Sequence, residues 1–313
     1  MSVVVGVDNF VRAETDRMFA ALQADAGGVN VFRHNRAPTA IAEQTVIRMN
    51  RDTLYSFAIA DISEGATVTV PDSGDRYLSV MVVNQDHYIN RLFHDPGEYD
   101  LTVAEFETPW VLVAVRVLVD PADPADIAAV AAIQDQLKID AGSSKPFEMP
   151  DYDTASFDAT RQAVLELAKH VGNLDHSFGT RDEVNPVRHL IATAAGWGGL
   201  PDSEARYISV DPGGGSSDSK LTVRDVPVDG FWSVSVYNAD GFFELNDRDA
   251  YSVNNITATP DDDGSITVHF GGCGDGRPNC LPITDGWNYI VRLYRPRPEV
   301  LDGSWTFPSA EPA

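Results

Sequence analysis

The sequence has little positive charge for its length. Its 313 residues include 23 Lys and Arg against 47 Asp and Glu, which gives a formal net charge of -24 at pH 7. A surplus of this sign repels phosphate backbones and anionic lipid headgroups. We therefore expect no nucleic acid and no membrane among the partners, although an acidic surface is also typical of an adaptation to solubility or high salt.

Long hydrophobic runs are also missing. No stretch approaches the ~18 apolar residues of a membrane-spanning helix. The first 19 residues have no basic segment ahead of their short apolar run, so they do not match a secretory signal peptide. These absences predict a cytoplasmic protein.

Only two cysteines are present, Cys273 and Cys280, in the stretch GGCGDGRPNC. A chain without an export signal normally keeps its thiols reduced. Zinc would need further ligands, and only His269 is near in the sequence. We therefore expect a Gly- and Pro-rich loop with reduced thiols, with a local disulfide as the alternative, and we predict no metal site.

Hydrophobic spacing separates an initial helix from a region of strands. Apolar residues recur at helical spacing until Gly27 and Gly28, which predicts an N-terminal helix within residues 1–30. Between residues 31 and 120 the pattern changes to short apolar runs separated by Gly, Pro, Asp and Asn. That change predicts an antiparallel sheet and a first β-sandwich.

Residues 121–200 have the pattern of a helical connector. Asp123 and Pro124 resemble the cap and first residue of one helix, and Thr180 with Glu183 resembles a capping box that starts another. Strand patterns return over residues 201–313, which predicts a second β-sandwich.

Two parts of the chain resemble each other. The stretch RYLSVMVVNQD, residues 76–86, aligns without gaps with the segment that contains FWSVSVYNAD, residues 231–240. Matches on the flanking strands indicate a duplication, and duplicated two-sheet domains protect their edges by packing. We therefore predict a mainly β protein with two related antiparallel β-sandwich, jelly-roll-like domains, an N-terminal helix and a helical connecting segment. The matched positions are Tyr77, Ser79, Val80, Val82, Asn84 and Asp86 with Phe231, Ser233, Val234, Val236, Asn238 and Asp240.

Several longer motifs resemble a known family. They are NRDTLYS and SGDRYLSV in the first half, and GWGGLP, DGFWSVSVYN, AYSVNNIT and GWNYIVRLYRP in the second. On these motifs the sequence resembles the paired bacterial domains of unknown function 1254 (N-terminal) and 1214 (C-terminal). The resemblance covers most of the chain and implies two jelly-roll-like sandwiches with helical additions, but no activity. Cys280 stands where many relatives carry Trp, so a differently shaped late loop is expected.

The stretch MNRDTLYS, residues 49–56, places Asn50, Arg51 and Asp52 just before a strand-like run. Strand alternation would put Arg51 and Tyr55 on one face and Asp52 on the other. A buried lone charge is costly, which predicts a polar network or pocket wall at this strand entrance. The alternative is a turn held by the side chains of Asn50 and Asp52, with Arg51 bound to a neighbouring carboxylate.

A second polar cluster occupies residues 84–94. It gathers an acid, two imidazoles, a phenol and a guanidinium, which are the groups used for proton transfer and oxyanion stabilisation. The duplicate keeps the Asn-x-Asp but has Gly241 and Phe242 in place of His87 and Tyr88. We interpret Asn-x-Asp as a repeated turn, and His87 and Tyr88 as the better site candidates.

Two functions remain after the absent motifs are considered. No HExxH, GxSxG elbow or phosphate-binding loop is present, so no cofactor is predicted. The favoured hypothesis is a cofactor-independent enzyme that acts on a small polar metabolite by acid/base chemistry, hydrolase- or lyase-like. The alternative is a β-sandwich that binds a glycan or small molecule without catalysis. A third possibility is a purely oligomerising scaffold, which the jelly-roll class allows; the protein would then be a homo-oligomer with the polar residues scattered on its surface.

The enzyme hypothesis assigns a role to each candidate residue. We expect MNRDTLYS to face the segment of His87 across adjacent strands, where His87 would titrate near neutrality and accept a proton. The predicted catalytic residues are Asp52, His87, Tyr55 and Tyr88, and the predicted substrate-binding residues are Arg51, Arg91, Asn50 and Asn84.

Overall fold

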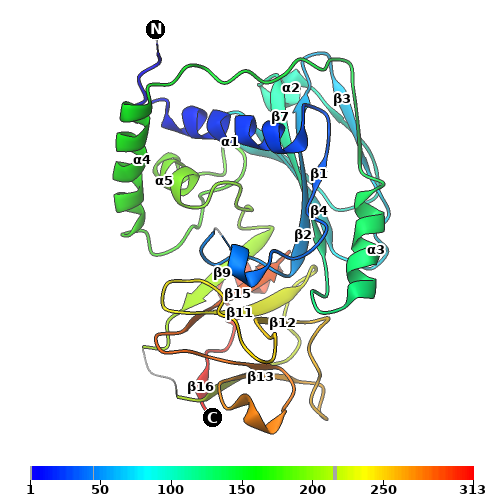
Figure 1. Ribbon diagram of the computed structural model, residues 1–313, viewed down its shortest axis with the longest axis vertical. Coiled ribbons are helices and arrows are strands. Elements are labelled where there is room, and N and C mark those ends of the chain that lie inside the picture. Colours follow the sequence, from blue (N-terminus) through cyan, green and yellow to red (C-terminus); the bar gives the residue numbers. More distant parts are fainter. Residues whose placement is uncertain (1, 45, 214–216) are drawn as a thin grey trace. The chain divides into compact units, whose positions relative to one another are not determined.

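The structure of the protein is a computed structural model that describes residues 2–44, 46–213 and 217–313. It is mainly β, as predicted, and most of its strand pairs are antiparallel (Figure 1). The chain folds into two compact units. The first comprises Met1–Arg36, Leu54–Leu118 and Ala128–Asp202, and the second comprises Ala37–Thr53, Val119–Ile127 and Ser203–Ala313. Two short segments from the first half of the chain therefore belong to the second unit.

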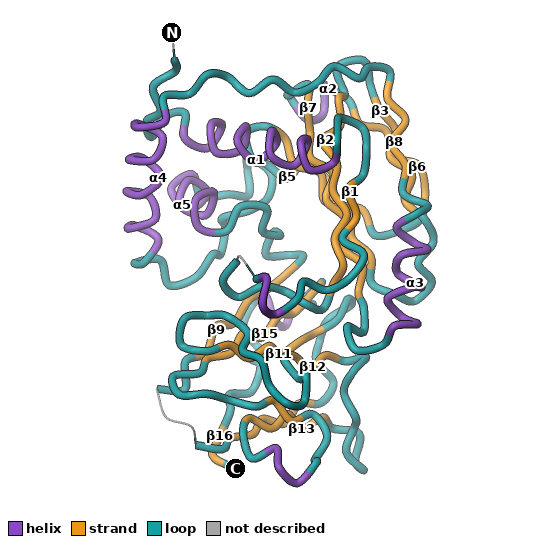
Figure 2. The backbone as a smooth tube through the Cα atoms, viewed as in Figure 1, coloured by secondary structure: helices purple, strands orange, loops and turns teal. Residues whose placement is uncertain are grey.

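The first unit contains a five-stranded sheet of order β1-β2-β7-β4-β5 and a three-stranded sheet of order β6-β3-β8. The three-stranded sheet lies on one side of the larger sheet, and the helices α1 (Phe10–Ala26), α4 (Thr154–Ala168) and α5 (Pro186–Ala195) lie on the other (Figure 2). Because both faces are covered, β4 is buried along its whole length. The strands are β1 (Arg33–His34), β2 (Thr53–Asp61), β3 (Ala66–Val70), β4 (Leu78–Asn84), β5 (Ile89–Phe93), β6 (Gly97–Leu101), β7 (Trp110–Leu118) and β8 (Lys138–Ala141).

The helices on that side share a small apolar core. α1 packs with α4 and α5 through Phe10, Phe157 and Ile191 (Figure 1). α1 ends, as predicted, where Gly27 adopts a φ of 81°. No helix within the described residues is both long and apolar enough to cross a membrane. The helix bounds are α1 (Phe10–Ala26), α2 (Val103–Phe106), α3 (Pro124–Gln134), α4 (Thr154–Ala168) and α5 (Pro186–Ala195).

Two features differ from the predicted helical connector. Thr180 and Glu183 do form side-chain contacts, but α5 begins only after Asn185, whose side chain accepts from the N–H groups of the first turn. The predicted start at Thr180 is therefore wrong, because a stronger cap with proline at the next position lies five residues later. Residues 138–141 also form a strand, β8, which pairs with β3.

The second unit consists of two four-stranded sheets, of order β12-β11-β15-β9 and β14-β13-β10-β16. Apolar side chains from both sheets, including Val234, Val291, Val268 and Phe270, form one core. The two sheets therefore pack face to face, as expected for a sandwich. The elements are β9 (Ala205–Val210), β10 (Ser219–Val223), β11 (Trp232–Tyr237), β12 (Ser252–Asn254), β13 (Ile266–Phe270), β14 (Cys280–Leu281), β15 (Asn288–Tyr294), β16 (Glu311–Pro312), α6 (Pro298–Leu301) and the short 3-10 helices η1 (Ile41–Glu43) and η2 (Cys273–Asp275).

The strand order supports the predicted duplication. The order β2-β7-β4-β5 in the first unit corresponds to β9-β15-β11-β12 in the second, and β6-β3-β8 corresponds to β13-β10-β16. The register agrees as well, because Ser79 pairs with Arg116 and Ser233 pairs with Arg292. Ser79 and Ser233 are therefore equivalent, as the sequence alignment predicted.

The repeated Asn-x-Asp forms the same turn in both units. Asn84 Oδ1 accepts from the N–H groups of Asp86 and Tyr88, at 2.9 and 3.0 Å. Asn238 Oδ1 accepts from the equivalent N–H groups at 3.1 and 3.0 Å. The fourth position has a positive φ in both copies, 62° at His87 and 83° at Gly241. The interpretation of Asn-x-Asp as a repeated turn is confirmed.

Cys273 and Cys280 form a disulfide. The expectation of reduced thiols is therefore wrong, and the alternative of a local bridge is correct. The two bridged cysteines are seven positions apart in the sequence. The loop that they close contains η2 and leads into β14. The sequence could not decide between these alternatives, because thiol spacing permits a bridge without requiring one.

We predict that this disulfide contributes measurably to stability. Closing so short a loop restricts the unfolded chain by about 2 kcal/mol. The double variant Cys273→Ser/Cys280→Ser should therefore melt about 4–8 °C below the oxidised protein in a calorimetric scan. The oxidised protein after treatment with a dithiol should behave like the double variant. Equal melting temperatures in all three samples would contradict the prediction.

Candidate functional site

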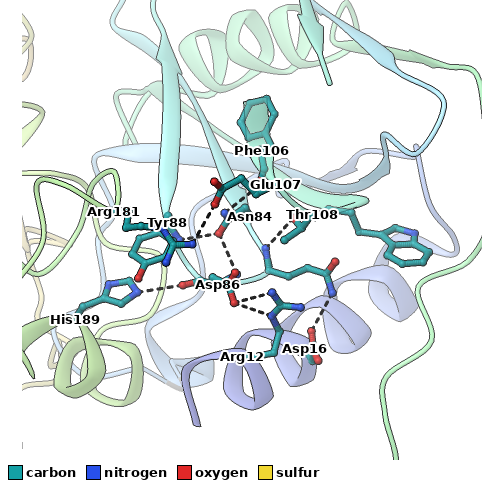
Figure 3. Close-up of polar contacts among 12 residues, drawn as sticks. Arg12, Asp16, Asn84, Asp86, Tyr88, Phe106, Glu107, Thr108, Arg181 and His189 are labelled. Carbon is teal, nitrogen blue, oxygen red and sulfur yellow. Dashed lines mark hydrogen bonds and ion pairs between the residues drawn. The ribbon is translucent and has the colours of Figure 1, made fainter. Parts of the chain in front are cut away.

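The turn that follows β4 is fastened to α1 by side-chain contacts (Figure 3). Arg12 Nη2 lies 2.6 Å from Asp86 Oδ1, and Arg12 Nε donates to the same oxygen at 2.9 Å. Gln85 Nε2 donates to Asp16 Oδ1 at 3.2 Å. Asn84 Nδ2 donates to the Phe106 carbonyl, which anchors the other end of the turn. Residues 84–88 are thus held rigidly within the first unit.

His87 is completely buried, and both of its ring nitrogens have partners. The N–H of Gly198 donates to Nε2 at 3.0 Å, so the proton of the neutral ring lies on Nδ1. Nδ1 lies 2.9 Å from Thr193 Oγ1, which itself donates to the carbonyl of His189. The ring therefore has no free nitrogen to offer a substrate in this arrangement.

His87 also belongs to a column of stacked planar groups. Its ring stacks on Trp197 at 5.2 Å and on His189 at 5.3 Å, measured between centroids. His189 stacks on Tyr88 at 4.8 Å, and the Arg181 guanidinium lies 4.6 Å from the Tyr88 centroid. Figure 3 shows the outer part of this column, Arg181, Tyr88 and His189. The contacts give His87 and Tyr88 a packing role that the sequence did not reveal.

Burial lowers the pKa of His87 well below its ordinary value, and the neighbouring His189 lowers it further. The expectation that His87 titrates near neutrality is therefore wrong. The physical reason is that an imidazolium at this position would lose its hydration in an apolar, aromatic surrounding. His87 is a neutral core residue in the first unit.

Asp52 lies in the second unit, in a turn rather than a strand. Asn50 Oδ1 accepts from the N–H of Asp52 at 2.9 Å, and β2 begins only at the next residue. Asp52 is fully buried, and its Oδ1 accepts from Ser252 Oγ at 3.2 Å and Asn254 Nδ2 at 3.1 Å. Its second oxygen, Oδ2, is buried with no hydrogen-bond partner among the described residues.

Ser233 has the same property one strand away. It is fully buried, and its hydroxyl has no hydrogen-bond partner within the described parts of the chain. In the sheet it pairs with Asn254 on one side and with Arg292 on the other. Ser233 and Asn254 are directly paired across neighbouring strands, so their side chains lie on the same face of the sheet, opposite the sandwich core. The Asn254 amide binds Asp52, so the Asp52 carboxylate lies on that face as well. We call Asp52, Ser233, Ser252, Asn254 and Arg292 the Asp52 cluster.

Arg292 brings a buried positive charge to this cluster. Its Nη1 donates to Ser235 Oγ at 2.8 Å, and its Nη2 donates to Tyr237 OH at 2.8 Å and to the carbonyl of Arg48 at 2.8 Å. The Tyr237 hydroxyl donates to the Met49 carbonyl at 2.7 Å, and burial raises its pKa. The segment 48–52 is thereby fixed across the polar face of the sheet.

The other predicted site residues have separate surroundings. Arg51 lies 5.3 Å from the centroid of the Tyr251 ring, in the second unit. In the first unit, the Tyr55 ring lies 5.4 Å from the Arg116 guanidinium, and Arg91 pairs with Glu105 at 3.2 Å on a half-exposed surface. The expectation of adjacent strands is wrong, because β7 lies between β2 and β4 in the sheet. Asp52 and His87 belong to different units, so the predicted meeting of these two side chains stays a prediction.

The buried arginines and the partners of Asp52 were not among the predicted site residues. Arg116 and Arg292 occupy equivalent positions opposite Ser79 and Ser233. The flanking strands that match between the two halves carry these arginines, in WVLVAVRV (residues 110–117) and WNYIVRLY (residues 287–294). Counted from the Trp, the two arginines are offset by one residue, which conceals their equivalence in the sequence. Within the described ranges, no three His, Cys, Asp or Glu side chains are grouped so that they could hold a metal ion.

Comparisons with known proteins define the family. Residues 29–141 match the family described as Protein of unknown function (DUF1254), and residues 210–298 match Protein of unknown function (DUF1214). The chain belongs to the family of proteins that pair these two domains. No curated protein matches the sequence.

Two solved structures share the fold. The VPA0106 protein from Vibrio parahaemolyticus is 19% identical, with a TM-score of 0.73 over 98% of this chain and 97% of its own. An uncharacterised protein from Burkholderia cenocepacia is 16% identical, with a TM-score of 0.52 over 91% of this chain and 84% of its own. At these identities the likeness concerns the fold alone.

We predict that His87 contributes to stability. His87→Ala removes stacking on two rings and two buried hydrogen bonds, and should lower the free energy of unfolding by about 3 kcal/mol. His87→Asn should lower it less, because Asn tolerates the positive φ. Urea unfolding measures both values. Arg91→Ala, which removes a half-exposed ion pair, should change it by less than about 1 kcal/mol. An unchanged stability in His87→Ala would contradict the packing role.

We also predict a dependence on pH. The ordinary pKa of His is 6.5, and that of folded His87 lies below it. At a pH between these two pKa values, the unfolded chain binds a proton at His87 that the folded chain does not bind. The contribution of the neutral His87 ring to stability is therefore fully present above the ordinary pKa and decreases as the pH falls below it. Between pH 7.5 and 5.5 the wild-type protein should lose about 1 kcal/mol more than His87→Asn. Equal losses in both proteins would assign the effect to other groups.

Proposed function

We propose that the protein is a cofactor-independent enzyme that acts on a small polar molecule by acid/base chemistry, with Asp52 as the proton acceptor. The observation that supports this most is the buried Asp52 carboxylate, whose Oδ2 has no hydrogen-bond partner among the described residues. A buried polar atom without a partner costs free energy, so its retention needs an explanation. A ligand that donates a hydrogen bond to Oδ2 would supply one.

The surroundings of Asp52 suit a proton acceptor. Ser252 and Asn254 both donate to Oδ1, so they fix the direction of the carboxylate and leave the lone pairs of Oδ2 for a ligand. A positioned carboxylate that takes a proton in the transition state typically increases the rate by about two to four orders of magnitude. The proton would come from water in a hydrolase or from the substrate in a lyase.

Two further groups in the same unit extend the proposed site. The Ser233 hydroxyl has no partner within the described residues and can donate to or accept from a ligand. The buried Arg292 guanidinium supplies a fixed positive charge that stabilises negative charge developing nearby. The proton-accepting role expected for His87 is not part of this proposal, because both of its ring nitrogens have partners. The roles expected for Arg51, Asn50, Asn84, Tyr55, Tyr88 and Arg91 stay predictions.

Binding of a small molecule or glycan without turnover is the second candidate. The same unpartnered atoms, Asp52 Oδ2 and Ser233 Oγ, support it, because two polar groups can orient a hydroxyl-bearing ligand without any reaction. Detecting turnover separates the two candidates.

The proposal predicts that Asp52→Asn abolishes activity while the fold persists. A thermal-shift screen of small polar metabolites, with esters, amides and hydroxy acids, identifies ligands, and NMR of the ligand then detects turnover. A hit should stabilise the wild-type protein but not Asp52→Asn, and turnover in the variant should fall at least about 100-fold. Asn has nearly the same shape and keeps an oxygen for Ser252 and Asn254.

Asp240→Asn is the matched control, because it also removes a carboxylate from the second unit but at an exposed turn. It should bind and turn over the ligand as the wild-type protein does. Binding without turnover in the wild-type protein would favour the second candidate. Equal binding and turnover in Asp52→Asn would exclude Asp52 as the site.

A further inference from the structure

The disulfide loop is in direct contact with a neighbouring arginine of the same unit. Arg248 Nη1 donates to the carbonyl of Cys273 at 2.9 Å, and its Nη2 donates to the carbonyl of Arg277 at 3.4 Å. Both carbonyls lie between Cys273 and Cys280, inside the ring that the disulfide closes. The position of Arg248 therefore depends on the shape that the disulfide gives to this loop.

Arg248 is part of a tightly bonded segment, residues 246–251. Asn246 Oδ1 accepts from the N–H of Arg248 at 3.1 Å and from the N–H of Ala250 at 3.2 Å. Asn246 Nδ2 donates to the Ala250 carbonyl at 3.0 Å. One side chain thus binds three backbone groups and connects Arg248 with Ala250, which directly precedes Tyr251.

Those following residues contact the segment that carries Asp52. The Tyr251 ring lies 5.3 Å from the Arg51 guanidinium, measured to the ring centroid. Ser252 Oγ donates to Asp52 Oδ1 at 3.2 Å. A continuous series of bonded groups therefore connects the disulfide loop, through Arg248, with the side chains that orient the Asp52 carboxylate.

We propose that the Cys273–Cys280 disulfide is a redox switch that controls the order of the Asp52 cluster. The change in order does not depend on the proposed function. Only its consequence, control of the activity at Asp52, rests on that function. In the oxidised state the closed loop holds Arg248, and Arg248 holds the segment before Tyr251 and Ser252. In the reduced state the loop carbonyls are released, and the segment loses this support.

The reductant is a dithiol, and the exchange is balanced. One thiolate of the dithiol attacks the sulfur of Cys273, because Cys273 is half-buried whereas Cys280 is a buried residue. The S–S bond breaks, Cys280 leaves as a thiolate and takes up a proton, and a mixed disulfide forms at Cys273. The second thiolate of the dithiol then displaces Cys273, which also takes up a proton. The protein gains two thiols, and the dithiol becomes a cyclic disulfide.

Hydrogen–deuterium exchange of the full chain, with and without dithiothreitol, tests the switch. Reduction should increase the exchange rate at least fivefold in peptides covering residues 246–254 and 48–53, besides the loop itself. Arg248→Gln, measured while oxidised, should show the faster exchange over 246–254, with no further increase there on reduction. Arg224→Gln is the control, because it removes an exposed ion pair with Asp263 in the same unit and should respond as the wild-type protein does.

Faster exchange confined to residues 271–281 on reduction would overturn the proposal. So would an oxidised Arg248→Gln with the exchange of the wild-type protein. Reduction of the wild-type protein needs no variant, so the test holds even where a substitution prevents folding. The exchange readout needs no substrate. The switch can therefore fail while Asp52→Asn still abolishes turnover, and it can hold in a protein for which no turnover is found.

Discussion

The antiparallel pairing of two buried central strands organises each unit, β4 with β7 in the first and β11 with β15 in the second. One face of each central strand carries Val residues toward the opposing sheet, and the other face carries Ser79 or Ser233 beside a buried arginine. A charge on that face must be covered and hydrogen-bonded. The covering elements are where the two copies of the fold differ.

The first unit covers this face with helices, and the second covers it with an incoming chain segment. In the first unit Arg116 donates to the Gly198 carbonyl after α5, and His87 fills the turn position that Gly241 holds in the other copy. In the second unit, residues 48–52 bind Arg292 and place a carboxylate over β12. A shared strand arrangement thus supports an aromatic packing column in one copy and a buried acid in the other.

The sequence predicted the parts of the fold that depend on local patterns. Each of these patterns is encoded within a few residues: the strand alternation, the Asn-x-Asp turn and Gly27 after α1. The duplication and α1 could therefore be predicted from the sequence. The partners of Asp52 lie about 200 residues away in the sequence, at Ser252 and Asn254, and no local pattern connects them. His87 was misjudged for the same reason, because burial by distant elements, not residue type, sets its pKa.

The distinction between satisfied and unsatisfied buried groups decides which cluster is the better candidate for chemistry. His87 has a partner at each nitrogen and stacks on two rings, so a substrate could reach it only by breaking interactions that stabilise the core. Asp52 keeps one oxygen without a partner among the described residues, and Ser233 keeps its hydroxyl. Asp52 and Ser233 are as fully buried as His87, so a ligand would also have to displace covering residues to reach them, but there it would gain hydrogen bonds that no described residue supplies. This difference between Asp52 and His87 supports placing the proposed chemistry at the Asp52 cluster. The serine alone does not, because the equivalent Ser79 hydroxyl of the first unit also has no partner among the described residues.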